Sequence, residues 1–260
     1  MRAAKKIAVA GATGRVGRHV VDVLEARGHH VVPISRSVGV DVITGEGLAE
    51  ALAGVETVID TASWPSPEQE AATEFFTTAA RNLHEVGGQA GVEQLVVVSI
   101  IGIDRFTAGY LAAKRAHEQA MLAGPIPVRI LRAAQFHEFV EPLVDWGRNG
   151  DVSYVLPMRT QLVAARTVAE ALADLALTDG SEPAPGSPIP EIAGPREENL
   201  VDVARLLAAR RGDAIRIEPV RDPADPDSAL YDAGALLPGP TATLAGPTFE
   251  AWLDSTSSER

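Results

Sequence analysis

The chain has 260 residues, of which 46% are hydrophobic and 22% charged, a composition typical of a globular protein with one sizeable core. Its formal net charge of −12 disfavours nucleic acid and anionic membranes as partners, and its lack of cysteine excludes disulfides, thiolate nucleophiles and cysteine-based metal sites. The histidines show no metal-binding spacing, and no apolar run has the length of a membrane span or the pattern of a secretory leader, so we expect a cytoplasmic protein without a bound metal.

A short apolar run, Ile7–Ala10, predicts a buried strand that ends at a glycine-rich turn. The glycines Gly11, Gly14 and Gly17 follow with the spacing G-x-x-G-x-x-G, and a helix is expected over roughly 14–27. Glycine permits a tight turn and a close backbone approach to phosphate, and the first turn of a helix offers unpaired N–H groups to an anion. The stretch therefore predicts a dinucleotide phosphate site that also includes Thr13, Arg15 and Val16. The alternative is a glycine-rich turn without a ligand.

The second predicted strand, His30–Ile34, is followed by Ser35 and Arg36. A fold that prefers NAD usually carries an acidic residue here, which accepts hydrogen bonds from the ribose. Arg36 suits a 2′-phosphate instead, and Arg15 is expected to reach the same group. We therefore predict NADP(H) in preference to NAD(H). The alternative for Arg36 is a solvated loop charge.

Two further strand–helix units continue the pattern. Asp41 and Val42, both expected near the cofactor, lead to a helix at about 46–53 and a third strand at 56–61. The residues at the end of this strand should face the cofactor; they are Thr61, Ala62 and Ser63. Asp60 is expected to position backbone, and Trp64 to pack in the next loop or to cover the cofactor.

A long helix at about 68–86 and a fourth strand at 93–101 complete the unit. Four such units with near-continuous apolar strands predict an α/β fold with a Rossmann-like, doubly wound parallel sheet. We expect an NAD(P)-binding core over 1–140. Residues 141–260 are expected to complete the fold and form a small substrate lobe, within a single compact unit.

A candidate catalytic set follows the fourth strand. Ser99 lies at the strand end, and Tyr110 and Lys114 lie four residues apart on a helix that runs to about Leu122. An ammonium beside a phenol lowers the pKa of the phenol, so Tyr110 is a candidate proton donor to a carbonyl oxygen that Ser99 would hold. The alternatives are an aromatic packed at a helix start for Tyr110 and a solvated charge for Lys114. His117 and Glu118 are expected to be exposed.

The remainder of the chain contains shorter elements. A strand at 128–133 precedes Gln135, Phe136 and His137, which are candidates for the substrate pocket; for His137 and Glu138 the alternative is the start of a surface helix. Helices are expected at 168–177 and 200–210, and a strand at 215–220. A last amphipathic piece includes Phe249, Trp252 and Leu253. The segment 180–190 is expected to be an exposed loop, and the tail 255–260 to be frayed.

These features together resemble a known superfamily. The run Gly11-Ala-Thr-Gly14-Arg-Val-Gly17, the strand that ends in Ser99 and the pair Tyr110-x-x-x-Lys114 are similar to the short-chain dehydrogenases/reductases, and within them to the atypical, NmrA-like NAD(P)-binding family. The resemblance covers about 7–140. It implies that Lys114 also holds the nicotinamide ribose, and that the protein is a monomer or a homodimer with a small-molecule substrate.

The chain departs from the standard branch at two places. Thr61-Ala62-Ser63 stands where that branch has Asn-Ala-Gly, and the spacing from Ser99 to Tyr110, 11 residues, is shorter than usual. Many atypical members bind NADP without turning it over. The resemblance therefore supports cofactor binding more strongly than catalysis.

Three functions follow from this interpretation. The first is an NADPH-dependent reductase in which hydride passes to a small carbonyl, quinone or conjugated acceptor while Tyr110 supplies the proton. The second is a non-catalytic NADP(H) sensor of the NmrA type, which would need only the glycine turn and Arg36. The third is a nucleotide-sugar epimerase or dehydratase. It ranks last because the chain is short for that class and its C-terminal part lacks an arginine cluster.

Overall fold

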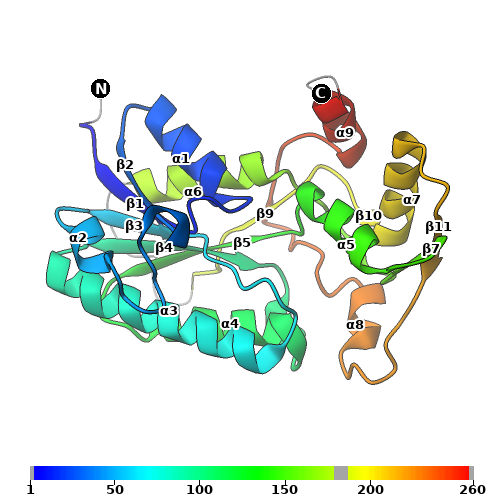
Figure 1. The fold of residues 1–260 in the computed structure, drawn as a ribbon, viewed down its shortest axis with the longest axis horizontal. Helices are drawn as coiled ribbons and strands as arrows, with labels where there is room; N and C mark the ends of the chain where they lie inside the picture. Colours follow the sequence, from blue (N-terminus) through cyan, green and yellow to red (C-terminus); the bar gives the residue numbers. More distant parts are fainter. Residues whose placement is uncertain (1–2, 179–186, 258–260) are drawn as a thin grey trace. The chain divides into compact units, whose positions relative to one another are not determined.

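The computed structural model describes residues 3–178 and 187–257. The chain divides into two compact units (Figure 1). The first unit comprises Met1–Ser99, Gly109–Arg132 and Val168–Ile189, and the second comprises Ile100–Ala108, Ala133–Thr167 and Pro190–Arg260. The first unit therefore takes residues from both sides of position 140.

A parallel sheet forms the centre of the first unit. Within this unit the strands have the order β5-β4-β3-β1-β2, in which β1 lies between β2 and β3 and pairs in parallel with both. This order, with its reversal at β1, confirms the Rossmann-like, doubly wound sheet. The strands are β1 (Lys6–Ala10), β2 (His30–Ile34), β3 (Thr57–Asp60), β4 (Gln94–Ile100) and β5 (Val128–Ala133).

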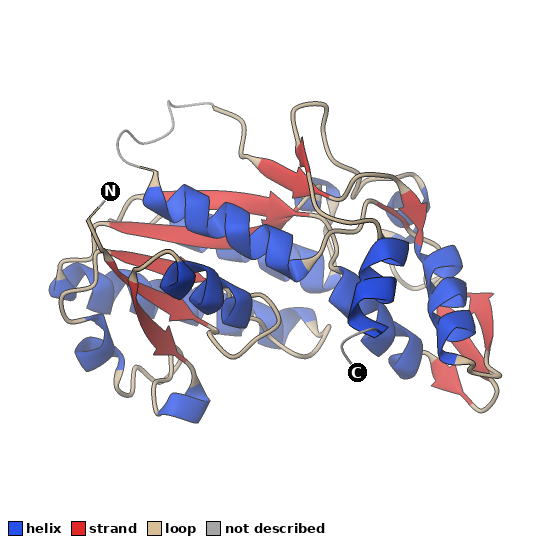
Figure 2. Cartoon of the chain, turned by 90° about the horizontal axis from the view of Figure 1, so that it is seen from above, coloured by secondary structure: helices blue, strands red, loops and turns tan. Residues whose placement is uncertain are grey.

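Helices cover both faces of this sheet (Figures 1 and 2). On one face lie α1 and α6, which are joined by a 2.7 Å hydrogen bond from Arg27 to Asp174. On the other face lie α2, α3 and α4. The helices of this unit are α1 (Gly17–Ala26), α2 (Leu48–Leu52), α3 (Gln69–Ala90), α4 (Gly109–Leu122) and α6 (Ala165–Leu177), with a 3-10 turn η1 (Arg36–Val38) after β2.

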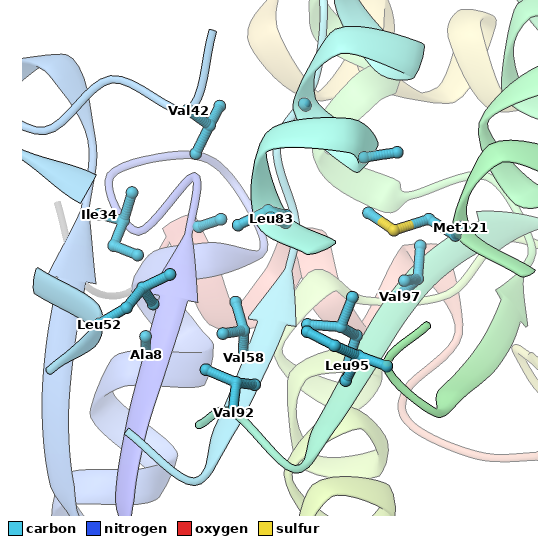
Figure 3. Packing of buried hydrophobic residues seen from close by; sticks show 14 of the residues in the cluster. Ala8, Ile34, Val42, Leu52, Val58, Leu83, Val92, Leu95, Val97 and Met121 are labelled. Atoms are coloured by element: carbon cyan, nitrogen blue, oxygen red, sulfur yellow. The ribbon is translucent and has the colours of Figure 1, made fainter. Parts of the chain in front are cut away.

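The core of the first unit follows from the two-residue period of its strands (Figure 3). Ala8 and Ala10 of β1 belong to the cluster that packs against α2, α3 and α4, where Leu83 and Met121 are fully buried. Ile7 and Val9 alternate with them and are fully buried as well. A strand that is buried on both faces has to be apolar throughout, which is why the sequence Ile7–Ala10 is an unbroken apolar run.

The register of the sheet brings the ends of four strands together. Ala10 pairs with Ile34 of β2 and with Asp60 of β3, and Asp60 pairs with Val97 of β4. Because these strands are parallel, the residues that follow them lie along one edge of the sheet. This is the edge at which open α/β sheets bind their ligands.

The second unit is built from shorter elements. Strand β7 (Val152–Val155) pairs in parallel with β11 (Arg216–Pro219) and antiparallel with β6 (Arg148–Asn149). Strand β8 (Arg159–Thr160) forms a two-stranded antiparallel sheet with β10 (Glu198–Asn199), and β9 (Glu191–Ala193) pairs in parallel with β12 (Thr243–Leu244). Its helices are α5 (Val140–Trp146), α7 (Leu200–Arg211), α8 (Ser228–Asp232) and α9 (Phe249–Ser257), with 3-10 turns η2 (Ile103–Arg105) and η3 (His137–Phe139).

The expected elements are present, with most boundaries within three residues. Helix α3 is longer than expected, because it continues to Ala90 and ends at Gly91, whose φ is +80°. The expectation that the tail frays from residue 255 is wrong at its start, since α9 continues to Ser257. Most of the expected loop at 180–190 lies outside the described residues. Among the residues that the structure describes, no helix is long and apolar enough to cross a membrane, and no cluster of side chains has the composition of a metal site.

Candidate active site

The glycine turn after β1 is held by main-chain hydrogen bonds. The N–H groups of Gly11 and Ala12 both donate to the carbonyl of Ile34, over 2.9 and 3.2 Å, and the N–H of Gly14 donates to the carbonyl of Gly11 over 2.9 Å. Gly11 has a φ of +74°, which favours glycine. At Gly17, a Cβ atom would lie 2.1 Å from the carbonyl oxygen of Gly11. The helix α1 therefore approaches the turn more closely than any side chain permits.

The amino end of α1 is open toward this turn. Val16 caps the helix without a side-chain hydrogen bond, and the first turn contains no acidic residue. Gly14 is exposed, as are Thr13 and Arg15, whereas Val16 and Gly17 are buried. Uncapped N–H groups at the positive end of a helix form an anion site. The turn thus has the chemical features of an anion site, and its role in binding the diphosphate of a dinucleotide stays a prediction.

The residues after β2 leave a guanidinium next to the turn. Arg36 lies two residues beyond Ile34, the residue whose carbonyl holds the turn, and its side chain is exposed. In the part of the chain that the structure describes, Arg36 forms no ion pair. Ser35 and Ser37 are joined by a hydrogen bond of 2.8 Å between their hydroxyl oxygens. The arrangement leaves Arg36 able to bind a phosphate.

Asp41 and Val42 shape the loop that follows. The Asp41 carboxylate accepts from the N–H of Ile43 over 2.7 Å, and Val42 is buried. The side-chain amide of Asn82, on α3, donates to the carbonyls of both Val42 and Ile43 over 2.8 Å. Asn82 is absent from the sequence prediction, because nothing local to it indicates a partner 40 residues away. These contacts fix the loop beside β2.

The residues after β3 tie that strand to the glycine turn. The hydroxyl of Thr61 donates to the carbonyl of Ala10 over 2.7 Å, and the N–H of Ala62 donates to the carboxylate of Asp60 over 2.9 Å. The expectation that Asp60 positions backbone is therefore confirmed. Ser63 extends this segment toward α4, where its hydroxyl lies 3.0 Å from the hydroxyl of Tyr110.

Tyr110 occupies the first turn of α4 and packs edge-on against Phe76 of α3, with ring centroids 5.7 Å apart. Burial and the negative charge of Asp60 raise the pKa of the Tyr110 phenol above its usual value, although the hydrogen bond with Ser63 acts in the opposite direction. The expectation that Lys114 lowers this pKa is wrong in this structure, because the ammonium is bound elsewhere. No hydrogen bond joins Lys114 to Tyr110.

Lys114 is buried, with only 4% of its surface exposed, so its interpretation as a solvated charge is wrong. Its Nζ donates to the carbonyl of Val98 over 2.9 Å and lies 3.0 Å from Nδ1 of His117. The same atom stands 4.6 Å from the centre of the Phe76 ring. Burial lowers the pKa of Lys114 to about 8, although Asp60 and Glu118 oppose the shift.

His117 and Glu118, expected at the surface, are both buried. His117 Nε2 lies 3.1 Å from the carboxylate of Asp60, and its ring stacks on Phe76 at 4.8 Å. Glu118 accepts two hydrogen bonds from Arg132 of β5, over 2.9 and 2.7 Å. One signal in the sequence could have placed His117. Tyr110, Lys114 and His117 have the spacing i, i+4, i+7, which puts all three on one face of a helix.

Ser99 is buried at the end of β4. Its hydroxyl has no hydrogen-bond partner among the described residues, and it is not joined to Tyr110. Trp64 packs on Phe75, with centroids 5.3 Å apart, which agrees with the packing interpretation. The structure thus brings Tyr110 to Ser63, brings Lys114 to His117 and Asp60, and leaves the hydroxyl of Ser99 without a partner.

Three weaker candidates, Gln135, Phe136 and His137, belong to the second unit. The side-chain amide oxygen of Gln135 accepts from the Thr160 hydroxyl, and Phe136 forms a parallel bridge with Val163. His137 begins a 3-10 turn, as the alternative interpretation expected, but it is only 1% exposed and packs against aromatic rings. Those rings are Phe249 and Trp252, and Nε2 of His137 lies 3.1 Å from the carbonyl of Pro247.

The fold and the glycine turn define the chain as an NAD(P)-binding Rossmann protein. A family model described as NAD(P)H-binding matches residues 11–178, which is more than half of the chain, and the chain belongs to this family. The match includes the glycine turn, Arg36, Ser99, Tyr110 and Lys114. No curated protein matches the chain.

Solved structures with the same fold cover almost the whole chain. MoeE5 in complex with UDP-glucuronic acid and NAD has 18% identity and a TM-score of 0.71, over 98% of this chain and 100% of that one. A short-chain dehydrogenase/reductase superfamily protein from Agrobacterium tumefaciens with bound NAD has 16% identity and a TM-score of 0.65, over 97% and 96%. A dTDP-4-dehydrorhamnose reductase from Bacillus anthracis in complex with NADP has 15% identity and a TM-score of 0.66, over 100% of both chains.

Proposed function

We propose that the chain is an NADPH-dependent oxidoreductase that passes hydride to a small carbonyl, quinone or conjugated acceptor, with Tyr110 as the proton donor. One observation carries this proposal. The Tyr110 hydroxyl lies 3.0 Å from the Ser63 hydroxyl, and Ser63 lies two residues beyond Thr61, which donates to the carbonyl of Ala10 just before the glycine turn. A phenol and a dinucleotide phosphate site therefore share one edge of the sheet.

The raised pKa of Tyr110 suits this role. A proton donor has to hold its proton at neutral pH and release it to the oxygen on which negative charge develops. Ser63 orients the phenol, and the unpartnered hydroxyl of Ser99 is free to donate to the acceptor oxygen. Lys114 places a positive charge on the same helix face. NADPH, when bound, supplies the hydride.

The preference for NADP(H) rests on charge. Arg36 is exposed, follows the carbonyl that holds the glycine turn, and forms no ion pair within the described residues. No acidic residue occupies 35–37 to accept hydrogen bonds from a ribose, as NAD-binding folds usually require. Arg36 binds the 2′-phosphate in this proposal, and the exposed Arg15 adds a second positive charge.

Titration of the purified protein with NADPH and NADH, followed by nicotinamide fluorescence with and without a small quinone, tests the proposal. Tighter binding of NADPH than of NADH, followed by oxidation when quinone is added, is the expected result. If neither nucleotide binds, the proposal is wrong at its foundation. If NADPH binds tightly but no member of a carbonyl and quinone panel oxidises it, the result favours a second candidate function, an NADP(H) sensor.

That second candidate is an NADP(H) sensor without turnover. The observation that favours it is the position of Lys114, whose ammonium is bound by Val98 and His117 and is not bonded to Tyr110. A sensor needs the glycine turn and Arg36 but no proton donor. In that case Tyr110→Phe changes neither the affinity for NADPH nor the effect of the protein on its partner.

A third candidate is a nucleotide-sugar enzyme. Chain length does not argue against it, because the MoeE5 structure, which holds UDP-glucuronic acid and NAD, is covered over its full length by this chain. Calorimetric titration of the NAD(P)-loaded protein with UDP-glucuronic acid distinguishes this candidate. Binding would favour it, and no binding would favour the small acceptors.

A further inference from the structure

We propose that His117, oriented by Asp60, is a positioning residue that holds the Lys114 ammonium in one fixed place beneath the Phe76 ring. The proposal deepens the proposed function, on which it rests for the role of Lys114. It starts from three buried polar side chains that come from two elements and are in contact. Asp60 ends β3, whereas Lys114 and His117 lie three residues apart on α4.

The contact with Lys114 fixes the tautomer of His117. An ammonium has only donors, so Nδ1 of His117, 3.0 Å from Lys114 Nζ, has to be the acceptor. The imidazole is then neutral and carries its proton on Nε2, which faces the carboxylate of Asp60 at 3.1 Å. The other oxygen of Asp60 accepts from the N–H of Ala62 at 2.9 Å, which fixes the carboxylate itself.

The surroundings favour the same protonation states. Phe76 of α3 stacks on the His117 ring, and the Lys114 ammonium lies over the Phe76 ring. A positive charge on His117 would therefore be buried beside the ammonium. Burial and the charge of Lys114 lower the pKa of His117, although Asp60 and Glu118 oppose the shift. Glu118 is itself paired with Arg132 of β5. The neutral imidazole is therefore the form that fits between Asp60 and Lys114.

The arrangement gives Lys114 two fixed acceptors. Val98 contributes a carbonyl at 2.9 Å and His117 a ring nitrogen at 3.0 Å, so two of the three ammonium N–H groups are satisfied by the protein. Among the described residues, no hydrogen-bond acceptor is recorded for the third N–H. Without His117 the ammonium would retain one acceptor, and its long side chain would regain rotamer freedom. Binding of the nicotinamide ribose by Lys114 would then have to restore that order.

Two amide substitutions separate positioning from packing. In His117→Asn the side-chain oxygen stands close to the place of Nδ1 and still accepts from Lys114, but it does not reach Asp60. In His117→Gln the amide reaches toward Asp60 and the acceptor for Lys114 is lost. A role in packing alone would favour the larger glutamine, whereas positioning of Lys114 favours asparagine.

The first measurement is the tautomer of His117 in the wild-type protein at pH 7, by long-range proton–nitrogen NMR with labelled histidine. His117 is assigned by its absence from both variants. A neutral ring with the proton on Nε2 is expected. A proton on Nδ1, or a doubly protonated ring, would overturn the proposal. This spectrum needs neither cofactor nor turnover, so its outcome is independent of the proposed function.

The second measurement is the dissociation constant for NADPH in both variants, with thermal melting as the check on folding. We expect His117→Gln to weaken binding about tenfold, as the loss of one fixed charge-assisted contact does, and His117→Asn to stay within about threefold of the wild type. Equal effects of the two variants, or a larger effect of asparagine, would overturn the proposal. If the wild type binds no NADPH, the proposed function fails, and the NMR spectrum decides for His117.

Discussion

Two regions of the first unit contribute to the candidate active site, and they are built in different ways. The glycine turn at 11–17 is held by main-chain atoms, through the carbonyls of Ile34 and Gly11. The helix face formed by Tyr110, Lys114 and His117 is held by side chains that reach Ser63 and Asp60. The difference teaches where each region is vulnerable: we expect an added Cβ atom at Gly17 to disrupt the first, and the removal of a polar group to disrupt the second.

The largest effect is expected from adding one carbon atom to the glycine turn. In Gly17→Ala the new Cβ atom would lie 2.1 Å from the carbonyl oxygen of Gly11, so α1 has to move away from the turn. We expect the free energy of unfolding to fall by about 3 kcal/mol and NADPH binding to be lost. Chemical denaturation and fluorescence titration measure both effects.

The control is Gly88→Ala in α3, where nothing lies within 4 Å of the added Cβ atom. Because glycine is unfavourable within a helix, this change is expected to raise stability by up to about 1 kcal/mol. Equal stabilities for Gly17→Ala and the wild type would contradict the main-chain description of the turn.

Removal of one oxygen tests the helix face. In Tyr110→Phe the ring still packs on Phe76, but the hydroxyl beside Ser63 is lost. Turnover with an accepted substrate is expected to fall by about 100-fold or more, with NADPH affinity within about threefold of the wild type. Tyr154→Phe, at a tyrosine that is 45% exposed in the second unit, serves as the control and should change neither value. Unchanged turnover in Tyr110→Phe would remove the proposed proton donor.

Buried Lys114 predicts a pH dependence of stability. Its pKa is lowered to about 8 in the folded protein, whereas the unfolded chain keeps the proton to about pH 10.4. The unfolded state therefore binds more protons between these values, so the contribution of Lys114 to the free energy of unfolding rises as the pH increases. Relative to Lys114→Met, we expect the wild type to gain about 2 kcal/mol between pH 8 and pH 10. Parallel denaturation curves for the two proteins across this range would show that Lys114 has an ordinary pKa.

The smallest effect concerns a side chain beside the turn. Arg36→Ala is expected to reduce the preference for NADPH over NADH by about tenfold, through the loss of one charged contact with phosphate, while NADH affinity stays nearly constant. Arg81→Ala, at an exposed arginine of α3, is the matched control for the change in net charge. If Arg36→Ala weakens the binding of both nucleotides by similar factors, the guanidinium does not bind the 2′-phosphate.

The sequence predicts the glycine turn well, but it does not predict the contacts of the helix face. The parallel sheet, its helices and the glycine turn depend on periodicity and on residue types close together in the chain, so Gly11, Gly14 and Gly17 are sufficient to place the turn. The helix face depends on Asp60, which lies 57 residues before His117 in the sequence. The spacing i, i+4, i+7 puts His117 on the same helix face as Tyr110 and Lys114, but local patterns contain no information about its distant partner Asp60.

The direction in which the pKa of Tyr110 shifts could not be predicted from local sequence either. A lysine four residues along a helix predicts an ammonium beside the phenol, but the rotamer of Lys114 depends on competing acceptors. The carbonyl of Val98 and the ring of His117 supply them, and only the packing of β4 against α4 brings the first within reach. Spacing along a helix identifies which residues share a face. The spacing does not determine which polar atom each side chain binds.

The hydrogen bonds that close the glycine turn have a consequence for sequence divergence. The three hydrogen bonds among Gly11, Ala12, Gly14 and Ile34 join backbone atoms alone, and every amino acid except proline carries both a backbone donor and a backbone acceptor. Substitution at Ala12 or Ile34 can therefore proceed for as long as the chain path is kept. A turn that is closed by backbone atoms can keep its conformation while its amino-acid sequence changes. The fold shared with MoeE5 at 18% identity is consistent with this.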